Sequence, residues 1–454
     1  MPQRFCMAFS IWRDNGKMRA RELVADGIQV LAARALSLVG AAAVGILVAR
    51  SLGPEGRGTY AVPAIVSSFV ATVFAGLSTA LASAMLKDGA GRGALRAALL
   101  AALPLVATGA IVAAGLSIAM HDLWAAPYAV GILPFLAASA IVNGYAYGRK
   151  NVRVVAIFAL ATPLVTLLLL GAGFALRGAS PPVAVAMWAG GNALVAAVGF
   201  GAVFWNSRGL ASQYVPVWPF FRYALAVGAT GLVAMLNYRI DLYIVAALTS
   251  HAELGLYTTA LSAAETLLVA AQVGSIVTVP QMGSLPQDQA AYLTARCVRN
   301  NLVFVGVCGL VAIVLAEPLV DLLYGRAFLP AVAPLRILVL GIVPWSAASI
   351  MSSYFTLNGK RPQVALCTAA ASAVACGIMA FVLVPRLGIS GAAIATTVSY
   401  AVSVVVMSVY FSKQTKVPIS QILFFQPEDF RGYRKLAVSF LSKEALGVEE
   451  PSRS

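Results

Sequence analysis

The chain has 454 residues, of which 60% are hydrophobic and 11% are charged, and its formal net charge at pH 7 is +15. Soluble domains carry about 25% charged residues, so this composition excludes a soluble globular protein and indicates an integral membrane protein. The apolar residues fall in runs of ~20, the length of a transmembrane helix, whereas the strands of a membrane barrel are alternating segments of ~10 residues. The sequence therefore predicts an all-α polytopic membrane protein.

Twelve apolar stretches are predicted to be transmembrane helices. In chain order they are residues 27–49, 60–86, 94–118, 124–146, 152–176, 182–205, 220–248, 256–280, 297–323, 331–356, 363–384 and 389–411. With the N-terminus placed inside, the predicted cytoplasmic loops carry 12 Lys and Arg and the predicted outer loops carry 5, Arg57 among them. This bias follows the positive-inside rule, so both termini are expected to be cytoplasmic.

Two short motifs recur in the two halves of the chain. GPEGRGTYAV (53–62) in the first half corresponds to HAELGLYTTA (251–260) in the second, and Gly148-Arg149-Lys150 corresponds to Gly359-Lys360-Arg361. The repeat predicts two six-helix bundles, related by an axis along the membrane normal as in parallel-repeat transporters. The expected organisation is an N-terminal segment (1–26), a first bundle (27–206), a cytoplasmic linker (207–219), a second bundle (220–412) and a tail (413–454).

The tail alternates aromatic and basic residues beyond position 423. This pattern is typical of an amphipathic helix on the inner leaflet. A partly disordered cytoplasmic tail fits the same residues equally well, and both interpretations stay open.

No motif for nucleotide hydrolysis or metal binding is found in the sequence. The glycine-rich GPEGRG lacks the Lys-Ser/Thr of a phosphate-binding loop and follows an apolar span, so it is interpreted as a tight turn. The five cysteines are not clustered with each other or with the two histidines. The net positive charge belongs to loops rather than to a nucleic-acid-binding face. We therefore expect no enzyme activity, cofactor, metal or nucleic-acid partner.

Charged and polar residues interrupt the stretch 220–248, which contains Asn237, Arg239 and Asp241. A charge near the bilayer centre costs about 2.5–3.5 kcal/mol on insertion scales, so such residues usually face a bundle interior or a wet cavity. Asn237 and Asp241 lie four residues apart and share a helix face, whereas Arg239 points to nearly the opposite side. The alternative is that Arg239 and Asp241 lie near the outer interface and extend to water.

Three more residues are candidates for a central cavity. Arg34 lies within the first predicted span, where it either lines the cavity or pairs with an acid for packing alone. Glu265, in the eighth span, is the second acid besides Asp241 that can pair with an arginine or a coupling cation. Arg336, near the outer end of the tenth span, is either a cavity residue or an interfacial anchor.

The arginines favour an anionic substrate, because a guanidinium binds phosphate in a bidentate way. An exporter of cations is instead expected to carry an unpaired carboxylate in its cavity. Arg34 and Arg239 are balanced by Asp241 and Glu265 in number, so the charge count alone does not decide the sign of the substrate.

Several stretches resemble the polysaccharide-exporter branch of the multidrug/oligosaccharidyl-lipid/polysaccharide (MOP) flippase superfamily. They are LVARSLGPEGRGTYAV (47–62), NYRIDLYIVAALTSHAELGLYTTALSAAE (237–265), LYGRAFLPAVAPLRIL (323–338), LNGKRPQVAL (357–366) and LVPRLGISGAAIATTVSY (383–400). The resemblance spans about residues 27–411 and implies a V-shaped fold of two six-helix lobes. The peptidoglycan-precursor flippases of this superfamily have fourteen spans, and the extra pair is not found here.

The resemblance implies a flippase that moves a polyprenyl-pyrophosphate-linked oligosaccharide across a bacterial inner membrane by alternating access. The implied partners are the lipid-linked substrate and membrane lipids. A proton or sodium ion is a candidate coupling ion, and a polysaccharide polymerase and glycosyltransferases are candidate protein partners. Two alternatives remain, an ion-coupled exporter of organic cations or drugs with the same fold, and a non-transporting scaffold for polysaccharide assembly.

Overall fold

The computed structural model shows a helical chain and describes the backbone of residues 2–88, 91–210, 213–282, 285–357, 361–424 and 426. The long helices are α1 (Pro2–Asp88), α2 (Gly91–Ala119), α4 (Leu133–Gly148), α5 (Val152–Arg177), α6 (Pro181–Asn206), α7 (Val217–Leu248), α8 (His251–Met282), α9 (Gln287–Tyr324), α10 (Val332–Leu357) and α11 (Pro362–Thr415). Shorter helices are η1 (Leu123–Ala125), α3 (Ala126–Gly131), η2 (Arg326–Ala331) and α12 (Ile419–Leu423). Within these ranges no strand occurs.

Helices α1 and α11 are each two helices joined at a glycine. Gly53 has φ 70° and Gly388 has φ 57°, and glycine adopts these positive values without the strain that a Cβ brings. Pro54 follows the first kink, where its missing N–H costs nothing because it starts a new helix. These kinks confirm the turn predicted in GPEGRG and the break predicted between residues 384 and 389.

Among the described residues, nine helical stretches are long and apolar enough to cross a membrane. Two of these nine contain a glycine kink and hold two predicted spans each, and α8 adds a further helix of 32 residues. Over the part of the chain that the structure covers, every predicted span thus coincides with a helix. The chain is a multi-pass membrane protein with the predicted twelve-helix architecture.

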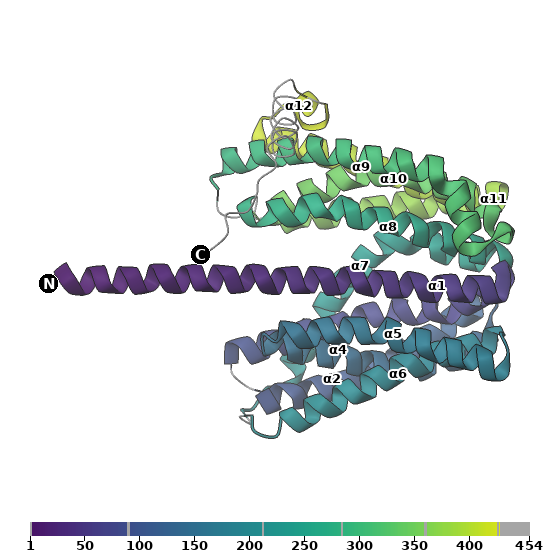
Figure 1. Ribbon diagram of the computed structural model, residues 1–454, viewed down its shortest axis with the longest axis horizontal. Helices are drawn as coiled ribbons and strands as arrows, with labels where there is room; N and C mark the ends of the chain where they lie inside the picture. Colours follow the sequence, from purple (N-terminus) through teal and green to yellow (C-terminus); the bar gives the residue numbers. More distant parts are fainter. Residues whose placement is uncertain are drawn as a thin grey trace, which may run out of the picture. The chain divides into compact units, whose positions relative to one another are not determined.

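The first of two compact units comprises Met1–Ser262, Glu317–Val332 and Met379–Ala392. Helix α1 is central to it and packs against α2, α4, α5, α6 and α7, while α4, α5 and α6 run alongside one another (Figure 1). The close approach of these helices to one another depends on small residues at their contacts. A Cβ on Gly76 of α1 would lie 1.9 Å from the carbonyl oxygen of Ala224 in α7, so only glycine permits this helix contact.

The second unit comprises Ala263–Ala316, Ala333–Ile378 and Ala393–Ser454. Its core contains an aromatic cluster in which Tyr354 and Phe411 pack edge to face with ring centroids 4.9 Å apart. Ile422 of α12 is fully buried in the same core, and the Arg299 guanidinium donates a hydrogen bond to the carbonyl oxygen of Gln421. These contacts fix the first residues of the predicted tail, whereas residues 427–454 lie outside the described range.

The two units do not follow the boundary predicted at residues 207–219, because α7 packs on α1 and α2 of the first unit. The division into two six-helix bundles stays a prediction.

Candidate functional site

A cavity of about 600 Å³ lies within the first unit, between both segments of α1 and helices α5, α6, α7 and α8. Ligand sites commonly have volumes of about 300–1,000 Å³ and combine apolar walls with a few polar groups. The polar lining consists of hydroxyl and amide groups, three aromatic side chains and two arginines: Ser37, Ser68, Thr162, Thr166, Asn192, Thr258, Ser262, Tyr60, Trp188, Tyr243, Arg57 and Arg239. The cavity therefore offers hydrogen-bond partners, aromatic surface and positive charge to a ligand.

Both charged residues of this lining are cations. Arg57 comes from the second segment of α1 and Arg239 from α7, and none of the described lining residues is Asp or Glu. In a site of low dielectric such charges act more strongly than in water. The cavity is thus suited to an anionic ligand.

Arg57 is 5% exposed, and its guanidinium is held by uncharged acceptors. Nη1 donates to the carbonyl oxygen of Gly45 at 2.8 Å, while Nε and Nη2 reach the hydroxyl and the carbonyl oxygen of Thr258, both at 3.4 Å. The guanidinium carbon lies 5.2 Å from the centre of the Tyr324 ring, within cation–π range. None of these described contacts involves a carboxylate, so the positive charge of Arg57 is not neutralised by them.

Tyr60 and Trp188 form an aromatic pair in the cavity wall. Their ring centroids are 6.4 Å apart and their planes are nearly perpendicular, an edge-to-face arrangement. The amide of Asn192 donates to the carbonyl oxygen of Trp188 one turn earlier on α6 at 2.9 Å. This hydrogen bond orients the Asn192 side chain.

Near Arg57, segments from distant parts of the sequence meet at one end of the helices. Arg50 donates to the carbonyl oxygens of Leu322 and Leu323, and a Cβ on Gly58 would lie 1.7 Å from the carbonyl oxygen of His251. We call this region, formed by residues 50–60, 120–122, 250–258 and 322–328, the Gly53 end. It is closed by direct packing between α1 and the start of α8.

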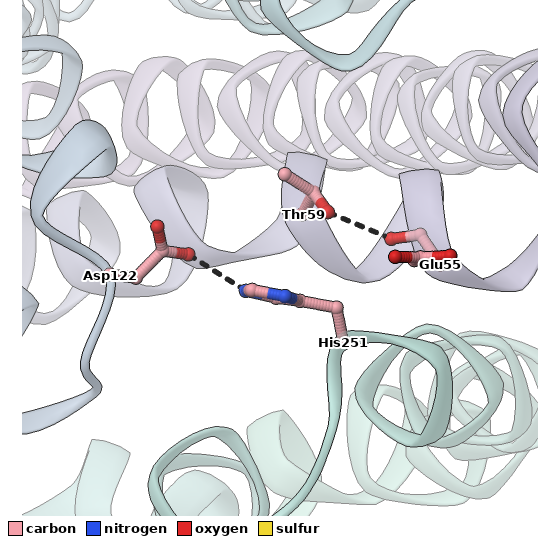
Figure 2. Close-up of polar contacts among 4 residues, drawn as sticks. All are labelled: Glu55, Thr59, Asp122 and His251. Carbon is pink, nitrogen blue, oxygen red and sulfur yellow. Dashed lines mark hydrogen bonds and ion pairs between the residues drawn. The ribbon is translucent and has the colours of Figure 1, made fainter.

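A hydrogen bond between Asp122 and His251 adds to the contacts of the Gly53 end (Figure 2). Asp122, which follows α2, and His251, which begins α8, point toward each other, with Asp122 Oδ2 2.9 Å from His251 Nε2. The Asp122 side chain is 2% exposed and that of His251 is 42% exposed. On the neighbouring turn of α1, the Thr59 hydroxyl donates to the carbonyl oxygen of Glu55 at 2.9 Å. The pair therefore links the end of α2 to α8 beside the kink of α1.

The structure separates the three polar residues predicted within residues 220–248. Arg239 is half-buried and lines the cavity. Asp241 does not line it but is 1% exposed and accepts hydrogen bonds from the Tyr257 hydroxyl and from the backbone N–H of Leu242. Asn237 is half-buried, and its Oδ1 has no hydrogen-bond partner among the described residues. The different faces expected for Arg239 and Asp241 are observed.

The other three candidate residues are not brought to this cavity by the described contacts. Glu265 is half-buried and belongs to the second unit. Arg336, also in the second unit, is exposed and donates from Nε to the carbonyl oxygen of Ile313 at 3.2 Å. The side chain of Arg34 lies outside the described residues. A role for these three in substrate binding stays a prediction.

Sequence reasoning missed Arg57, which had been assigned to an outer loop. The available signal was its spacing, because Arg57 lies three and four residues before Tyr60 and Ala61, and all three line the cavity. With the helix taken to start at Pro54, these residues share one helix face.

A polytopic helical protein with a cavity that combines apolar walls and polar groups has the general form of a membrane transporter. The family model described as "Polysaccharide biosynthesis protein" matches residues 46–333, more than half of the chain. The chain therefore belongs to this family of polysaccharide biosynthesis proteins. A search of curated proteins gave no match.

Solved structures of MOP superfamily transporters share the fold. The inward closed conformation of the lipid II flippase MurJ matches with a TM-score of 0.70 and 17% identity, over 92% of this chain and 96% of that chain. An inward-facing multidrug resistance MATE family transporter matches with a TM-score of 0.71 and 15% identity, over 86% and 98%. A transporter from Pyrococcus furiosus, described as having a binding pocket of reverse polarity, matches with a TM-score of 0.61 and 15% identity, over 86% and 94%. At these identities the likeness shows the fold alone.

Proposed function

We propose that this protein is a flippase that moves a polyprenyl-pyrophosphate-linked oligosaccharide from the inner to the outer leaflet by alternating access. The cargo is the repeat unit of an O-antigen, a capsule or an exopolysaccharide. Membership of the polysaccharide biosynthesis family supports a substrate from this pathway class. The proposed location is a bacterial inner membrane, with both termini in the cytoplasm.

The sign of the cavity charge is the observation that carries this proposal. Arg57 and Arg239 line the cavity, and no described lining residue is acidic. A pyrophosphate places two phosphate groups next to each other, and each presents oxygens to which a guanidinium can bind in a bidentate way. The positive charge favours this anion over a neutral or cationic head group.

The remaining lining suits the sugars of such a cargo. Hydroxyl and amide groups of Thr162, Thr166 and Asn192 can exchange hydrogen bonds with sugar hydroxyls. Trp188 and Tyr60 provide apolar ring surface with a polar edge. The polyprenyl chain stays in the lipid, which already provides the apolar environment that favours it.

The arrangement of Asp241 argues against an exporter of organic cations. Such an exporter needs a carboxylate that faces its cavity, and the acid nearest in sequence to Arg239 is instead buried against Tyr257. We infer that Asp241 stabilises the packing of α7 on α8 rather than binding cargo.

Binding to the purified full-length protein in lipid nanodiscs tests this proposal. The anionic probe is undecaprenyl pyrophosphate, and the cationic probe is tetraphenylphosphonium. We expect binding of the anionic probe, weakened about tenfold or more by Arg57→Gln or Arg239→Gln, because hydrogen bonds to charged groups contribute ~1.5–3 kcal/mol. Arg222→Gln is the matched control, since Arg222 is an exposed residue of α7 outside the cavity lining.

Each competing function gives its own result in this assay. Binding of tetraphenylphosphonium without binding of undecaprenyl pyrophosphate would replace the flippase by a cation exporter. Unchanged binding in both cavity variants would show that the arginines do not form the site. A scaffold without transport activity would bind neither probe.

A further inference from the structure

Arg57 has a second role, in conformational change, that rests on the proposed function. Arg57 lies both on the cavity wall and in the Gly53 end, because it contacts Thr258 of α8 and Tyr324 at the end of α9. A flippase that works by alternating access has to open this end when the cargo leaves, if the end faces outward as the proposed topology requires. Arg57 therefore lies where cargo bound in the cavity can affect the closure of the Gly53 end.

The contacts of Arg57 differ in strength. The bond from Nη1 to Gly45 is 2.8 Å long and joins two segments of the same helix, α1. The two contacts with Thr258 are 3.4 Å long, near the limit for a hydrogen bond, and these are the ones that reach α8. The link between α1 and α8 is thus the weaker part of the guanidinium's environment.

A phosphate in the cavity offers Arg57 a better acceptor than Thr258. Charge-assisted hydrogen bonds are shorter and roughly twice as strong as neutral ones, and a phosphate can accept two of them from one guanidinium. The guanidinium can keep the Gly45 contact and exchange the Thr258 contacts for the phosphate. Binding of the anion then removes a contact that holds α8 to α1.

We propose that Arg57 couples head-group binding to opening of the Gly53 end. In the empty cavity its guanidinium holds Thr258 and keeps α8 against α1. With a phosphate bound, it turns to the phosphate and releases α8. A ligand shifts a conformational equilibrium only by its differential affinity for the two states, and this exchange of partners at Arg57 supplies the difference.

Other contacts also hold the Gly53 end closed when no ligand is bound. Gly58 packs on the backbone of Gly255, and the hydrogen bond between Asp122 and His251 holds the start of α8. The contact of Arg57 with Thr258 is therefore one of several that close this end, and both of its residues also line the cavity.

A cysteine at Leu254 reports on opening. Leu254 is 1% exposed and precedes Gly255 of the Gly53 end, so a thiol there reacts with a water-soluble maleimide only when α8 moves away from its neighbours. The experiment uses the full-length chain in nanodiscs, with the five native cysteines replaced. Labelling of Leu254→Cys is measured with and without saturating undecaprenyl pyrophosphate, and binding of the probe is measured in the same samples.

The parent protein, which carries only the Leu254→Cys reporter, is expected to label slowly when empty. With the probe bound it should label at least about fivefold faster, because the two weak hydrogen bonds between Arg57 and Thr258 are lost. Arg57→Lys keeps the charge but cannot make the forked contacts, so its empty form is expected to label about fivefold faster already and to gain less than about twofold from the probe. Arg208→Lys makes the same change at an arginine that stacks on Trp205 outside the cavity, and should behave like the parent. Thr258→Val, which removes the hydroxyl acceptor and leaves Arg57 intact, should raise the empty rate by about twofold.

Two results would overturn the role of Arg57. One is slow labelling of empty Arg57→Lys together with a full response to the probe. The other is parent protein that binds the probe without any change in labelling. Absence of binding to the parent protein would instead contradict the proposed function itself, while the rates of empty Arg57→Lys and Thr258→Val would still report whether these contacts close the Gly53 end.

Discussion

Replacement of Gly58 by alanine is expected to separate α1 from α8. The added Cβ would lie 1.7 Å from the carbonyl oxygen of His251 and 3.0 Å from the backbone nitrogen of Gly255. Close carbon–oxygen contacts between helices are about 3.3 Å or longer, so the helices must move apart by roughly 1.5 Å. Gly255 is equally restricted, since its Cβ would lie 1.9 Å from the carbonyl oxygen of Pro54.

The cost of this movement follows from the contacts that it disturbs. Overpacking of a well-packed interface costs ~1–3 kcal/mol. The same shift stretches the contacts of Arg57 with Thr258, which are already 3.4 Å long, beyond hydrogen-bond range. We expect Gly58→Ala to destabilise the protein by at least about 2 kcal/mol, and Gly255→Ala to have a similar effect.

Thermal unfolding of the detergent-solubilised protein, followed by tryptophan fluorescence, measures this loss. Gly115→Ala is the matched control, because the added Cβ in α2 would meet nothing within 4 Å beyond the backbone of its own helix turns, and alanine is the better helix former by ~1 kcal/mol. The midpoint of Gly58→Ala should fall by several degrees while that of Gly115→Ala stays constant or rises. Equal midpoints for Gly58→Ala and the parent would refute the close packing of α1 on α8.

Three further predictions concern single contacts. Tyr257→Phe removes the hydroxyl that donates to the buried Asp241 side chain and should lower the free energy of unfolding by ~1.5–3 kcal/mol in the same assay. The loss should be smaller in an Asp241→Asn background, and equal losses in both backgrounds would contradict the contact. Asp122→Asn replaces the carboxylate opposite His251 and should speed the maleimide labelling of the Leu254→Cys reporter by about twofold. An unchanged rate would show that the hydrogen bond between these side chains does not close this end. Trp188→Leu removes aromatic surface from the cavity and leaves both arginines in place. It should therefore weaken binding of a sugar-bearing polyprenyl pyrophosphate but not binding of undecaprenyl pyrophosphate. Equal effects on the two lipids would exclude a sugar-binding role for Trp188.

The helices could be predicted from the sequence because the bilayer imposes their length and apolarity. The kink at Gly53 could also be predicted, since glycine directly before proline is a strong signal for a break between helices, and Gly388 follows Pro385 by three residues. Span ends were harder to place. Helix α9 begins at Gln287, ten residues before the predicted start, because a helix can continue beyond the membrane with polar residues that a hydropathy pattern does not detect.

The cavity was less predictable, because hydropathy gives depth in the membrane but not the direction in which a side chain points. Arg57 was placed in a loop, yet the second segment of α1 starts at Pro54 and carries Arg57 into the cavity wall. Arg239 and Asp241 were both recognised as charges within a span, and their spacing put them on different faces. Which of the two lines the cavity depends on Tyr257, a partner 16 residues from Asp241 on another helix.

The central claim is tested most directly by the lipids of cells depleted of this protein. Polyprenyl-pyrophosphate species are extracted and identified by mass spectrometry. Loss of a flippase should cause accumulation of one sugar-bearing lipid and loss of surface polymer. Both effects should be reversed by the unaltered gene and by Arg222→Gln, but not by Arg57→Gln or Arg239→Gln. An unchanged lipid pool, together with new sensitivity to cationic dyes, would contradict the flippase and identify an exporter of cations.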